Sequence, residues 1–288
     1  MTTEQEAPFL ELKDVVLDYR DGRFRPKHRV LDGVNFTVMR GETVAIVGES
    51  GSGKTTIAKA ILGLARIASG QILLNGQDIS SWSAKQRKSL VMDLQIIYQD
   101  PYRSLSPTRR IEQSLAEPVL AQEKLPREEM IERSSKMLEL VGLRPDARLK
   151  YPSQFSGGER QRIAIARALM LSPRLVICDE PLSSLDVSIQ GQVLNLLADL
   201  KASHHPSYLF ISHNIPVVRY FADKVVVLRN GEIVEAGDAE SVCGSPQHEY
   251  TRTLIDAVPD FDPDVQEARR ERRHAQASLV STPVVVEV

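Results

Sequence analysis

The chain opens with apolar and polar residues in loose alternation. Over residues 9–20 this pattern predicts an edge strand, residues 21–29 are polar and turn-rich, and the strand pattern resumes over 30–42. The first part of the chain is therefore expected to form a β-rich layer.

The next two elements differ in the spacing of their apolar residues. Residues 43–48 form an uninterrupted apolar run typical of a buried strand, and residues 54–65 carry Ile57, Ile61 and Leu64 at helical spacing. A glycine-rich stretch joins them, so the sequence predicts a strand, a glycine loop and a helix in that order.

Helical patterns dominate from about residue 105 to residue 170, where runs of strand type are missing. Helices are expected over residues 114–125, 127–143 and 159–170. We interpret this stretch as a helical subdomain, at about residues 100–170, inserted into the α/β domain.

Strands and a helix alternate again toward the C-terminus. Strand patterns cover residues 174–180, 207–213 and 224–237, and the last contains the hairpin signal Asn230-Gly231. The intervening segment 188–202 places Ile189, Val193, Leu196, Leu197 and Leu200 on one helical face. This alternation predicts an α/β fold with a mostly parallel sheet flanked by helices, over residues 1–258.

Beyond that domain the composition turns acidic, then basic over 267–274. A solvated, flexible tail over 259–288 is favoured over a patch for anionic lipid or nucleic acid, because acids interrupt the arginines and no aromatics interleave. No internal repeat is visible, which indicates one nucleotide-binding unit per chain.

Composition narrows the class of protein. Of the 288 residues 42% are hydrophobic, which suffices for a sizeable core, and 36 basic against 38 acidic residues create no global attraction to nucleic acid. Neither a secretory leader nor an apolar run of about 18 residues is present, so a cytoplasmic chain that crosses no membrane by itself is expected. Two cysteines provide no disulfide framework and too few thiolates for zinc or an iron–sulfur cluster, and Cys178 is expected as a buried hydrophobe.

Residues 48–55 (GESGSGKT) match G-x-x-x-x-G-K-[ST] between a predicted strand and a predicted helix, which is the context this phosphate loop requires. Backbone N–H groups and the helix N-terminus would face the phosphates of ATP, Lys54 would add a positive charge, and Thr55 would ligate Mg²⁺. A glycine turn with a surface lysine is the less favoured alternative. The predicted nucleotide-binding residues are Gly48, Ser50, Gly51, Gly53, Lys54, Thr55 and Thr56.

A pair of acids follows the apolar run 175–178. Asp179 suits Mg²⁺, directly or through a water, and Glu180 can accept a proton from the attacking water. Alone, two acids after a strand more often cap a helix, but with the phosphate loop the catalytic interpretation is favoured.

The segment Phe155-Ser-Gly-Gly-Glu-Arg-Gln-Arg162 resembles the signature of the ATP-binding cassette (ABC) family, and it precedes the acidic pair as in that family. Physically, Ser156, Gly157 and Gly158 open a helix and offer N–H groups to a phosphate. The resemblance implies a P-loop NTPase fold of ABC type, with an N-terminal antiparallel β layer. It also implies that two cassettes pair head to tail and sandwich each ATP.

Other positions match landmarks of that family. Gln99 matches the glutamine that senses Mg²⁺ and the γ-phosphate, Asp186 the loop that touches the opposite cassette, and His213 the histidine on the γ-phosphate. Tyr19 matches the aromatic residue that stacks on adenine, with Phe24 as the alternative and ordinary strand packing open for both.

Within the family, VGESGSGKTT, YQDPYRSLSP and SPQHEYTRTLIDAVP are most similar to ATPase subunits of oligopeptide and dipeptide permeases. This branch implies a peripheral subunit at the cytoplasmic face of the membrane, which drives transmembrane permease subunits and, indirectly, serves an extracytoplasmic solute-binding protein. A non-identical second ATPase is preferred and a homodimer stays open. Alternatives are transport of nickel, other small solutes or antimicrobial peptides, or a soluble ABC motor; no nucleic-acid partner is expected.

The sequence departs from the family pattern at three places. Glu159 stands where glutamine is commoner, which is expected to alter nucleotide affinity slightly, and His248-Glu249-Tyr250 lacks the proline usual before the tyrosine. The cysteine-rich C-terminal segment of some members is missing, so no iron–sulfur cluster is predicted.

Overall fold

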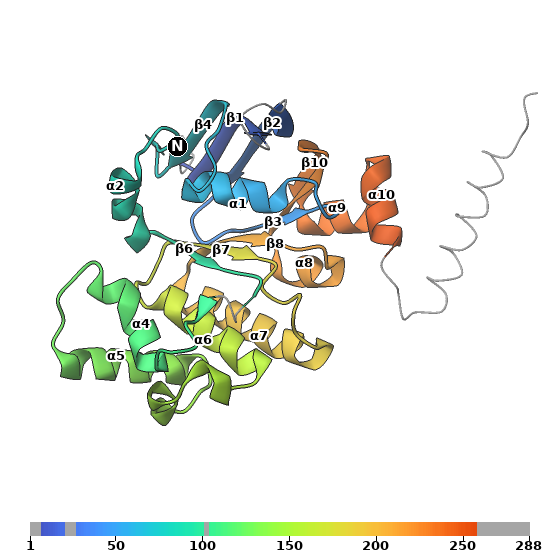
Figure 1. The fold of residues 1–288 in the computed structure, drawn as a ribbon. Helices are drawn as coiled ribbons and strands as arrows, with labels where there is room; N and C mark the ends of the chain where they lie inside the picture. Colours follow the sequence, from blue (N-terminus) through green and yellow to red (C-terminus); the bar gives the residue numbers. More distant parts are fainter. Residues whose placement is uncertain (1–6, 21–26, 101–103, 258–288) are drawn as a thin grey trace, which may run out of the picture.

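The computed structural model describes residues 7–20, 27–100 and 104–257. Two sheets and the helices around them build the fold (Figure 1). The predictions for Phe24 and for the tail 259–288 fall outside the described residues. Across the described ranges, no helix combines the length and hydropathy of a membrane span.

The N-terminal sheet is antiparallel, as expected. Its strands lie in the order β2-β1-β4-β5 and comprise β1 (Leu10–Arg20), β2 (Lys27–Val38), β4 (Ser69–Leu74) and β5 (Gln77–Asp78). The prediction of β1 as an edge strand is wrong, since β1 pairs with β2 on one side and β4 on the other. Its loose alternation reflects one buried face and a register shift beside Asp14, whose φ is +46°, and neither feature depends on being at an edge.

The central sheet is mostly parallel, as predicted. It runs β10-β9-β3-β8-β7-β6, with β3 (Thr43–Val47), β6 (Leu94–Ile97), β7 (Leu175–Asp179), β8 (Ser207–Ile211), β9 (Lys224–Arg229) and β10 (Glu232–Asp238). Only β10 is antiparallel to its neighbour, and it follows β9 through the predicted Asn230-Gly231 turn, in which φ is +50° and +87°.

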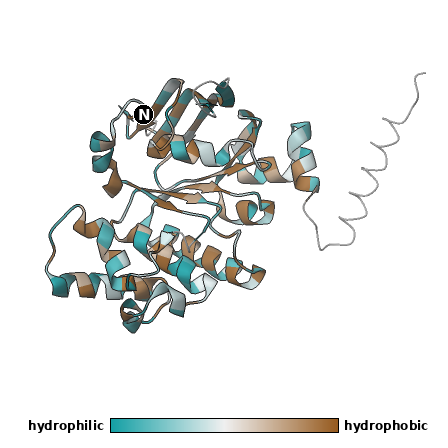
Figure 2. Ribbon diagram, in the orientation of Figure 1, coloured by the Kyte–Doolittle hydropathy of each residue, from teal (hydrophilic) through white to brown (hydrophobic). Residues whose placement is uncertain are grey.

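Successive side chains of the central strands enter different cores, because their directions alternate along a strand. In β7, Leu175 and Ile177 join the core shared with the N-terminal sheet, whereas Val176 and Cys178 join the core beneath the helices. Both faces are therefore buried, and the strands are predominantly hydrophobic in Figure 2. Cys178 is fully buried, as predicted, and burial raises the pKa of its thiol.

The helices cover both faces of the central sheet (Figure 1). Their bounds are α1 (Lys54–Leu62), α2 (Ala84–Arg87), α4 (Ile111–Leu120), α5 (Arg127–Leu140), α6 (Gly157–Leu169), α7 (Val187–His204), α8 (Ile215–Phe221), α9 (Ala239–Gly244) and α10 (Glu249–Asp256). Short 3₁₀ turns occupy Lys88–Met92, Pro145–Leu149 and Pro152–Gln154. Elements α4, α5 and α6 form the expected helical region, and none of the described residues between 105 and 170 forms a strand.

Two details of the helices differ from the sequence patterns. Helix α1 ends at Leu62, because Gly63 adopts a left-handed C-cap, so Leu64 lies outside the helix and is 67% exposed instead of continuing the apolar face. Glu249 is the first residue of α10, where a proline would also be tolerated since its missing N–H is not needed there. A negative charge in the first turn also interacts favourably with the helix dipole, so Glu249 is compatible with this position of the helix.

Candidate nucleotide site

The phosphate loop connects the carboxyl end of β3 to the first residue of α1. Gly48 has a φ of +153°, and a Cβ there would lie 2.1 Å from the carbonyl oxygen of Leu228, so only glycine allows this close approach. Gly53 is the N-cap of α1 in a left-handed conformation. The loop therefore presents the N-terminus of α1 to the pocket, as an anion site requires.

Lys54 is buried beneath this loop, only 5% exposed. Its Nζ donates hydrogen bonds to the carbonyl oxygens of Gly48 at 2.8 Å and Glu49 at 2.7 Å. Burial lowers the pKa of Lys54, and the neighbouring carboxylates of Glu180 and Asp179 act against that shift. The cation is thus held in place by backbone acceptors at the base of the loop.

Asp179, at the end of β7, contacts Thr55 directly. The Thr55 hydroxyl donates to Oδ1 of Asp179 at 3.0 Å. Burial raises the pKa of Asp179; the bond from Thr55 acts against it, and the charge of Glu180 adds to it. A hydroxyl and a desolvated carboxylate side by side form a hard oxygen pair of the kind that Mg²⁺ takes together with phosphate oxygens.

Glu180 follows Asp179 and has an unusual backbone, with a φ of +48°. Its N–H donates to the carbonyl oxygen of Ile211 at 3.0 Å, which ties it to the end of β8. A side chain in this left-handed region carries a conformational cost of about 1–3 kcal/mol and persists only where the surroundings impose it. The carboxylate is thereby directed over the ends of the parallel strands.

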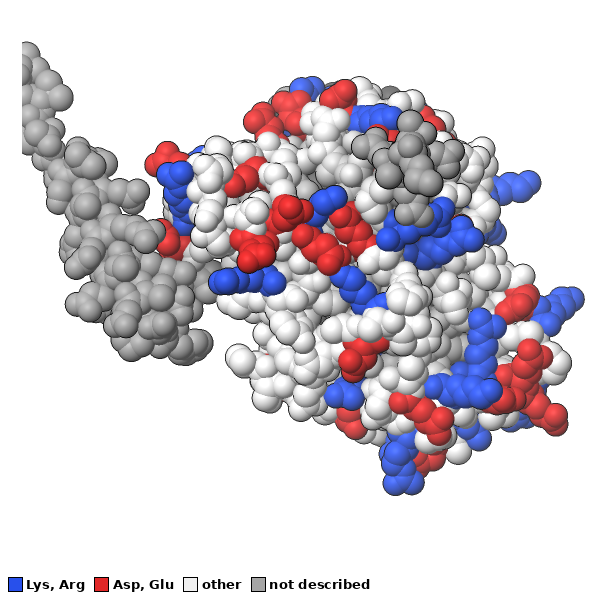
Figure 3. All heavy atoms as spheres, turned by 180° about the vertical axis from the view of Figure 1, so that it is seen from behind, with Lys and Arg blue, Asp and Glu red and all other residues white. Residues whose placement is uncertain are grey.

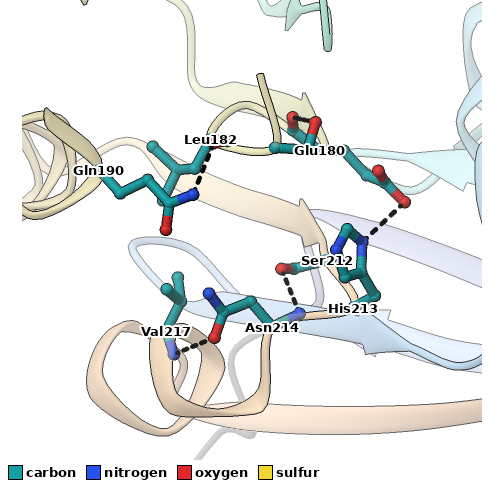
Figure 4. Close-up of a pocket in the computed structure, with 8 residues that line it drawn as sticks. Glu180, Leu182, Gln190, Ser212, His213, Asn214 and Val217 are labelled. Atoms are coloured by element: carbon teal, nitrogen blue, oxygen red, sulfur yellow. Dashed lines mark hydrogen bonds and ion pairs between the residues drawn. The ribbon is translucent and has the colours of Figure 1, made fainter. Parts of the chain in front are cut away.

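Two of the predicted residues meet at that carboxylate. Gln99 Nε2 donates to Glu180 Oε2 at 3.3 Å, and Nδ1 of His213 lies 3.4 Å from Glu180 Oε1. Figure 4 shows His213 turned toward Glu180, beside Ser212 and Asn214. The structure thus joins residues from the ends of β6, β7 and β8, which are far apart in the sequence.

His213 and Glu180 line a small cavity of about 70 Å³, and Gln99 and Glu180 line a larger, open pocket of about 430 Å³. The lining of the larger pocket consists of Val30, Ser50, Gly51, Gly53, Lys54, Thr55, Thr56, Gln99 and Glu180. Val30 was not predicted, because it reaches the pocket only through the pairing of β2 and leaves no chemical signal in the sequence. Ser184, two residues before Asp186, also contacts this group of residues, since its hydroxyl donates to the Gln99 carbonyl oxygen at 3.3 Å.

The signature segment lies outside this pocket, since none of residues 155–162 is among those that line it. Ser156 is the exposed N-cap of α6 and forms a reciprocal capping box with Glu159. Oε2 of Glu159 accepts bonds from the Ser156 N–H and hydroxyl, each at 2.8 Å, and the backbone bond is the main cause that lowers the pKa of Glu159. The signature therefore forms a separate helix N-terminus with its own carboxylate.

Further predicted residues that lie outside the pocket lining are Gly48, Asp179, His213, Asp186 and Tyr19. Asp186 is the N-cap of α7 and accepts bonds from the Ile189 N–H at 2.9 Å and the Ser188 hydroxyl at 2.8 Å. Tyr19 pairs with His28 in the N-terminal sheet and is 37% exposed. Neither geometry tests the expected contact with an opposite cassette or with adenine, so both stay predictions.

Comparison with known proteins identifies two regions. Residues 31–183 match the ABC transporter family, and residues 234–283 match the oligopeptide/dipeptide transporter C-terminal region.

Among relatives, the di/tripeptide transport ATP-binding protein DppF of Pseudomonas aeruginosa (strain UCBPP-PA14) is 48% identical over 236 residues, 82% of this chain and 73% of that protein. The dipeptide transport ATP-binding protein DppF of Escherichia coli (strain K12) is 41% identical, covering 98% and 85% of the two chains.

Solved structures with the same architecture include the dimeric, post-hydrolysis ATP-binding cassette MJ0796 bound to ADP and Pi. It has a TM-score of 0.72 and 26% identity over 80% of this chain and 98% of that chain. CbiO1 from Clostridium perfringens, part of the transporter complex cbiONQ, has a TM-score of 0.75 and 26% identity over 92% and 100% of the two chains.

Proposed function

Because this chain belongs to the ABC transporter family of ATP-binding, ATP-hydrolysing cassettes, we propose that it powers the import of oligopeptides or dipeptides through a membrane permease. The observation that most directly supports this proposal is that Thr55, Asp179 and Glu180 lie together beside the buried Lys54. These groups provide the cation, the metal ligands and the base that phosphoryl transfer to water requires.

Each residue has a separate role in this proposal. Lys54 and the loop N–H groups bind the triphosphate, and Glu180 accepts the proton of the attacking water. Gln99 and His213, which both contact the Glu180 carboxylate, orient that water and the γ-phosphate. Their contacts with opposite oxygens of Glu180 hold the base in one orientation before substrate arrives.

Thr55, Asp179 and Gln99 would hold Mg²⁺, which would neutralise charge on the phosphates when bound. Within the described ranges no three His, Cys, Asp or Glu side chains gather into a metal cluster. A site with one carboxylate suits Mg²⁺, which takes much of its coordination from phosphate oxygens and water.

Hydrolysis requires two cassettes in this proposal. Ser156 is exposed at the N-terminus of α6, Gly157 is partly buried and Gly158 is buried, and none of them lines the chain's own pocket. This N-terminus would therefore close over ATP bound to a partner cassette, with Asp186 beside the same interface. A non-identical ATPase is the preferred partner, as the sequence pattern around Gln99 indicates.

Peptide as the transported solute is supported by the C-terminal match over residues 234–283 and by the peptide transport proteins to which the chain is similar. The groove between α4 and α5, about 610 Å³, is lined by apolar Ala116, Leu120 and Met130 and rimmed by Arg109 and Glu112. We assign this groove to the permease subunits, which would hold the chain at the cytoplasmic face of the membrane. On the face seen in Figure 3, acidic and basic side chains are interspersed, and no single-sign patch suggests nucleic acid.

The test is Glu180→Gln in the complex purified with its permease subunits. Without the base, ATP hydrolysis and peptide uptake into vesicles should fall about 10²–10⁴-fold, while ATP still drives cassette pairing. Glu49→Gln is the matched control, because Glu49 is an exposed carboxylate of the same loop whose charge also acts on Lys54; its activity should stay near wild type. Wild-type turnover in Glu180→Gln would exclude Glu180 as the base, and a preparation without permease subunits would contradict the transporter assignment.

A further inference from the structure

The peptide unit between Gly48 and Glu49 is held at both of its polar atoms. Its carbonyl oxygen, on Gly48, accepts a hydrogen bond from Lys54 Nζ at 2.8 Å. Its N–H, on Glu49, donates to the phenolic oxygen of Tyr250 at 3.0 Å. Tyr250 and Lys54 thus form hydrogen bonds with the same peptide group, although Tyr250 is 201 positions from Glu49 in the sequence.

Tyr250 is itself firmly placed. It is 6% exposed and packs in a core with Val47 and Val227, and the guanidinium carbon of Arg229 lies 4.8 Å from its ring centroid. Its own N–H donates to Nδ1 of His248, the N-cap of α10, at 3.1 Å. The hydroxyl is therefore presented from a packed helix rather than from a mobile loop.

Helix α10 is in turn attached to the central sheet through one carboxylate. Glu235, on β10, accepts the N–H groups of Gln247 at 2.8 Å and His248 at 3.0 Å. Burial acts to raise the pKa of Glu235, but the hydrogen bonds it accepts lower it overall, so the carboxylate stays ionised. The central sheet therefore holds α10 in place, and α10 in turn holds the Tyr250 hydroxyl beside the phosphate loop.

The surroundings of the loop restrict how this peptide can move. A Cβ on Gly48 would overlap the Leu228 carbonyl oxygen at 2.1 Å, and the carbonyl oxygen of Ser52 accepts the Gly231 N–H at 2.9 Å. The backbone around the peptide is thus closely packed and hydrogen-bonded, and the bonds at its two polar atoms oppose rotation of the peptide plane. Loss of the Tyr250 hydroxyl would leave a partly buried N–H without this partner, which is costly unless the peptide turns.

We propose that Tyr250 is a positioning residue for nucleotide binding, which fixes the Gly48–Glu49 peptide so that its carbonyl holds Lys54 toward the phosphates. The inference rests on the proposed role of Lys54 in binding ATP. It makes nucleotide affinity depend on α10, an element within the segment that matches the oligopeptide/dipeptide transporter C-terminal region. Polarisation along hydrogen-bonded peptide groups strengthens the link between the phenol and the lysine.

Tyr250→Phe tests this inference, because it removes the hydroxyl and keeps the ring in its core. Titration of the full-length chain with ATP and with ADP should give Kd values about fivefold weaker than wild type, the effect of one hydrogen bond. KM for ATP should rise by a similar factor and kcat should change less than about twofold, since Tyr250 touches no reacting atom.

Tyr220→Phe is the matched control. Tyr220 is exposed and its hydroxyl donates to Asn195 Oδ1 at 3.2 Å, so this change also removes one phenolic hydrogen bond, but away from the phosphate loop. Its nucleotide Kd should equal that of wild type. A lower melting temperature with unchanged Kd in Tyr250→Phe would assign Tyr250 to folding alone and overturn the inference.

Lys54→Ala separates the two proposals. The fivefold effect of Tyr250→Phe should disappear in a Lys54→Ala background, because the peptide no longer has a lysine to hold. An equal effect in both backgrounds would overturn the inference. Wild-type affinity in Lys54→Ala would contradict the proposed function itself, whereas weak binding in Lys54→Ala with wild-type binding in Tyr250→Phe would contradict only the role of Tyr250.

Discussion

Gly158 and Gly157 are adjacent in the first turn of α6, yet alanine should affect them in opposite directions. A Cβ on Gly158 would lie 2.4 Å from Cγ2 of Ile189 on α7, whereas a Cβ on Gly157 would find Leu185 Cδ2 at 3.8 Å as its nearest neighbour. The first distance is well inside the contact separation of about 3.5–4.0 Å for two carbons, and the second is ordinary contact.

The two energies can be set against each other. Replacing glycine by alanine in a helix gains about 0.5–1 kcal/mol from reduced backbone entropy, and this gain applies to both positions. At Gly158 the overlap adds the cost of overpacking, about 1–3 kcal/mol, because Cγ2 is attached directly to the Ile189 β-carbon and cannot swing away without moving the side chain. Gly157→Ala should therefore stabilise the chain, and Gly158→Ala should destabilise it by about 1 kcal/mol.

Thermal unfolding of the nucleotide-free chain measures this contrast. A difference of about 2 kcal/mol between the variants corresponds to melting temperatures about 4–8 °C apart. Ile189→Ala removes Cγ2 and should abolish the penalty of Gly158→Ala, whereas Ile189→Val keeps Cγ2 and should not. Equal stability of the two glycine variants, or rescue by Ile189→Val as complete as by Ile189→Ala, would refute the reasoning.

Two predictions concern pH. Burial raises the pKa of Asp179 above its ordinary value of 3.8, so its contribution to stability is present below that value and is lost as pH rises through the folded pKa. Asp179→Asn should therefore melt at a higher temperature than wild type at neutral pH without nucleotide, while losing Mg²⁺-dependent hydrolysis; a lower melting temperature would contradict this. The pKa of Glu159 is instead lowered from 4.5, so its contribution is present above that value and is lost as pH falls through the folded pKa. Glu159→Gln should be less stable than wild type at neutral pH, because the amide lacks the charge that these bonds stabilise, and it should lose less stability below pH 4.5, as acid unfolding curves would show; parallel curves would exclude the capping box as the cause.

The fold was predictable where a local signal determines the backbone. Asn230-Gly231 specifies a hairpin turn because these residues accept positive φ, and the glycine loop before Lys54 specifies a strand, a turn and a helix. The position of a strand within a sheet could not be predicted in this way, because β1 would show the same alternation whether or not a second strand paired with it. Strand β4, which makes β1 an inner strand, is 6 residues long and its first three residues are exposed, so its apolar pattern is weak.

The site was predictable for a related reason. Chemistry-bearing residues at the carboxyl ends of parallel strands meet at one edge of the sheet, so Asp179 and Glu180 were expected beside the phosphate loop. The contacts of Glu180 with Gln99 and His213 follow from the strand order β8-β7-β6, which no local pattern encodes. The contact of Tyr250 with the phosphate loop was not predictable, because its hydrogen bond joins Glu49 to an element distant in sequence.

The β9–β10 turn has a consequence for engineering the chain. A hairpin tip of Asn-Gly type is ordinarily a tolerant place for an affinity tag or an inserted domain. Here Gly231 donates to Ser52 in the phosphate loop and accepts from Asp32, and a Cβ on it would lie 2.3 Å from the Val30 carbonyl oxygen. The second Asn-Gly turn, Asn75-Gly76, also has positive φ at both residues, and a Cβ on Gly76 would meet nothing within 4 Å. Labels belong at Gly76, because a label at Gly231 would move the loop that holds the nucleotide.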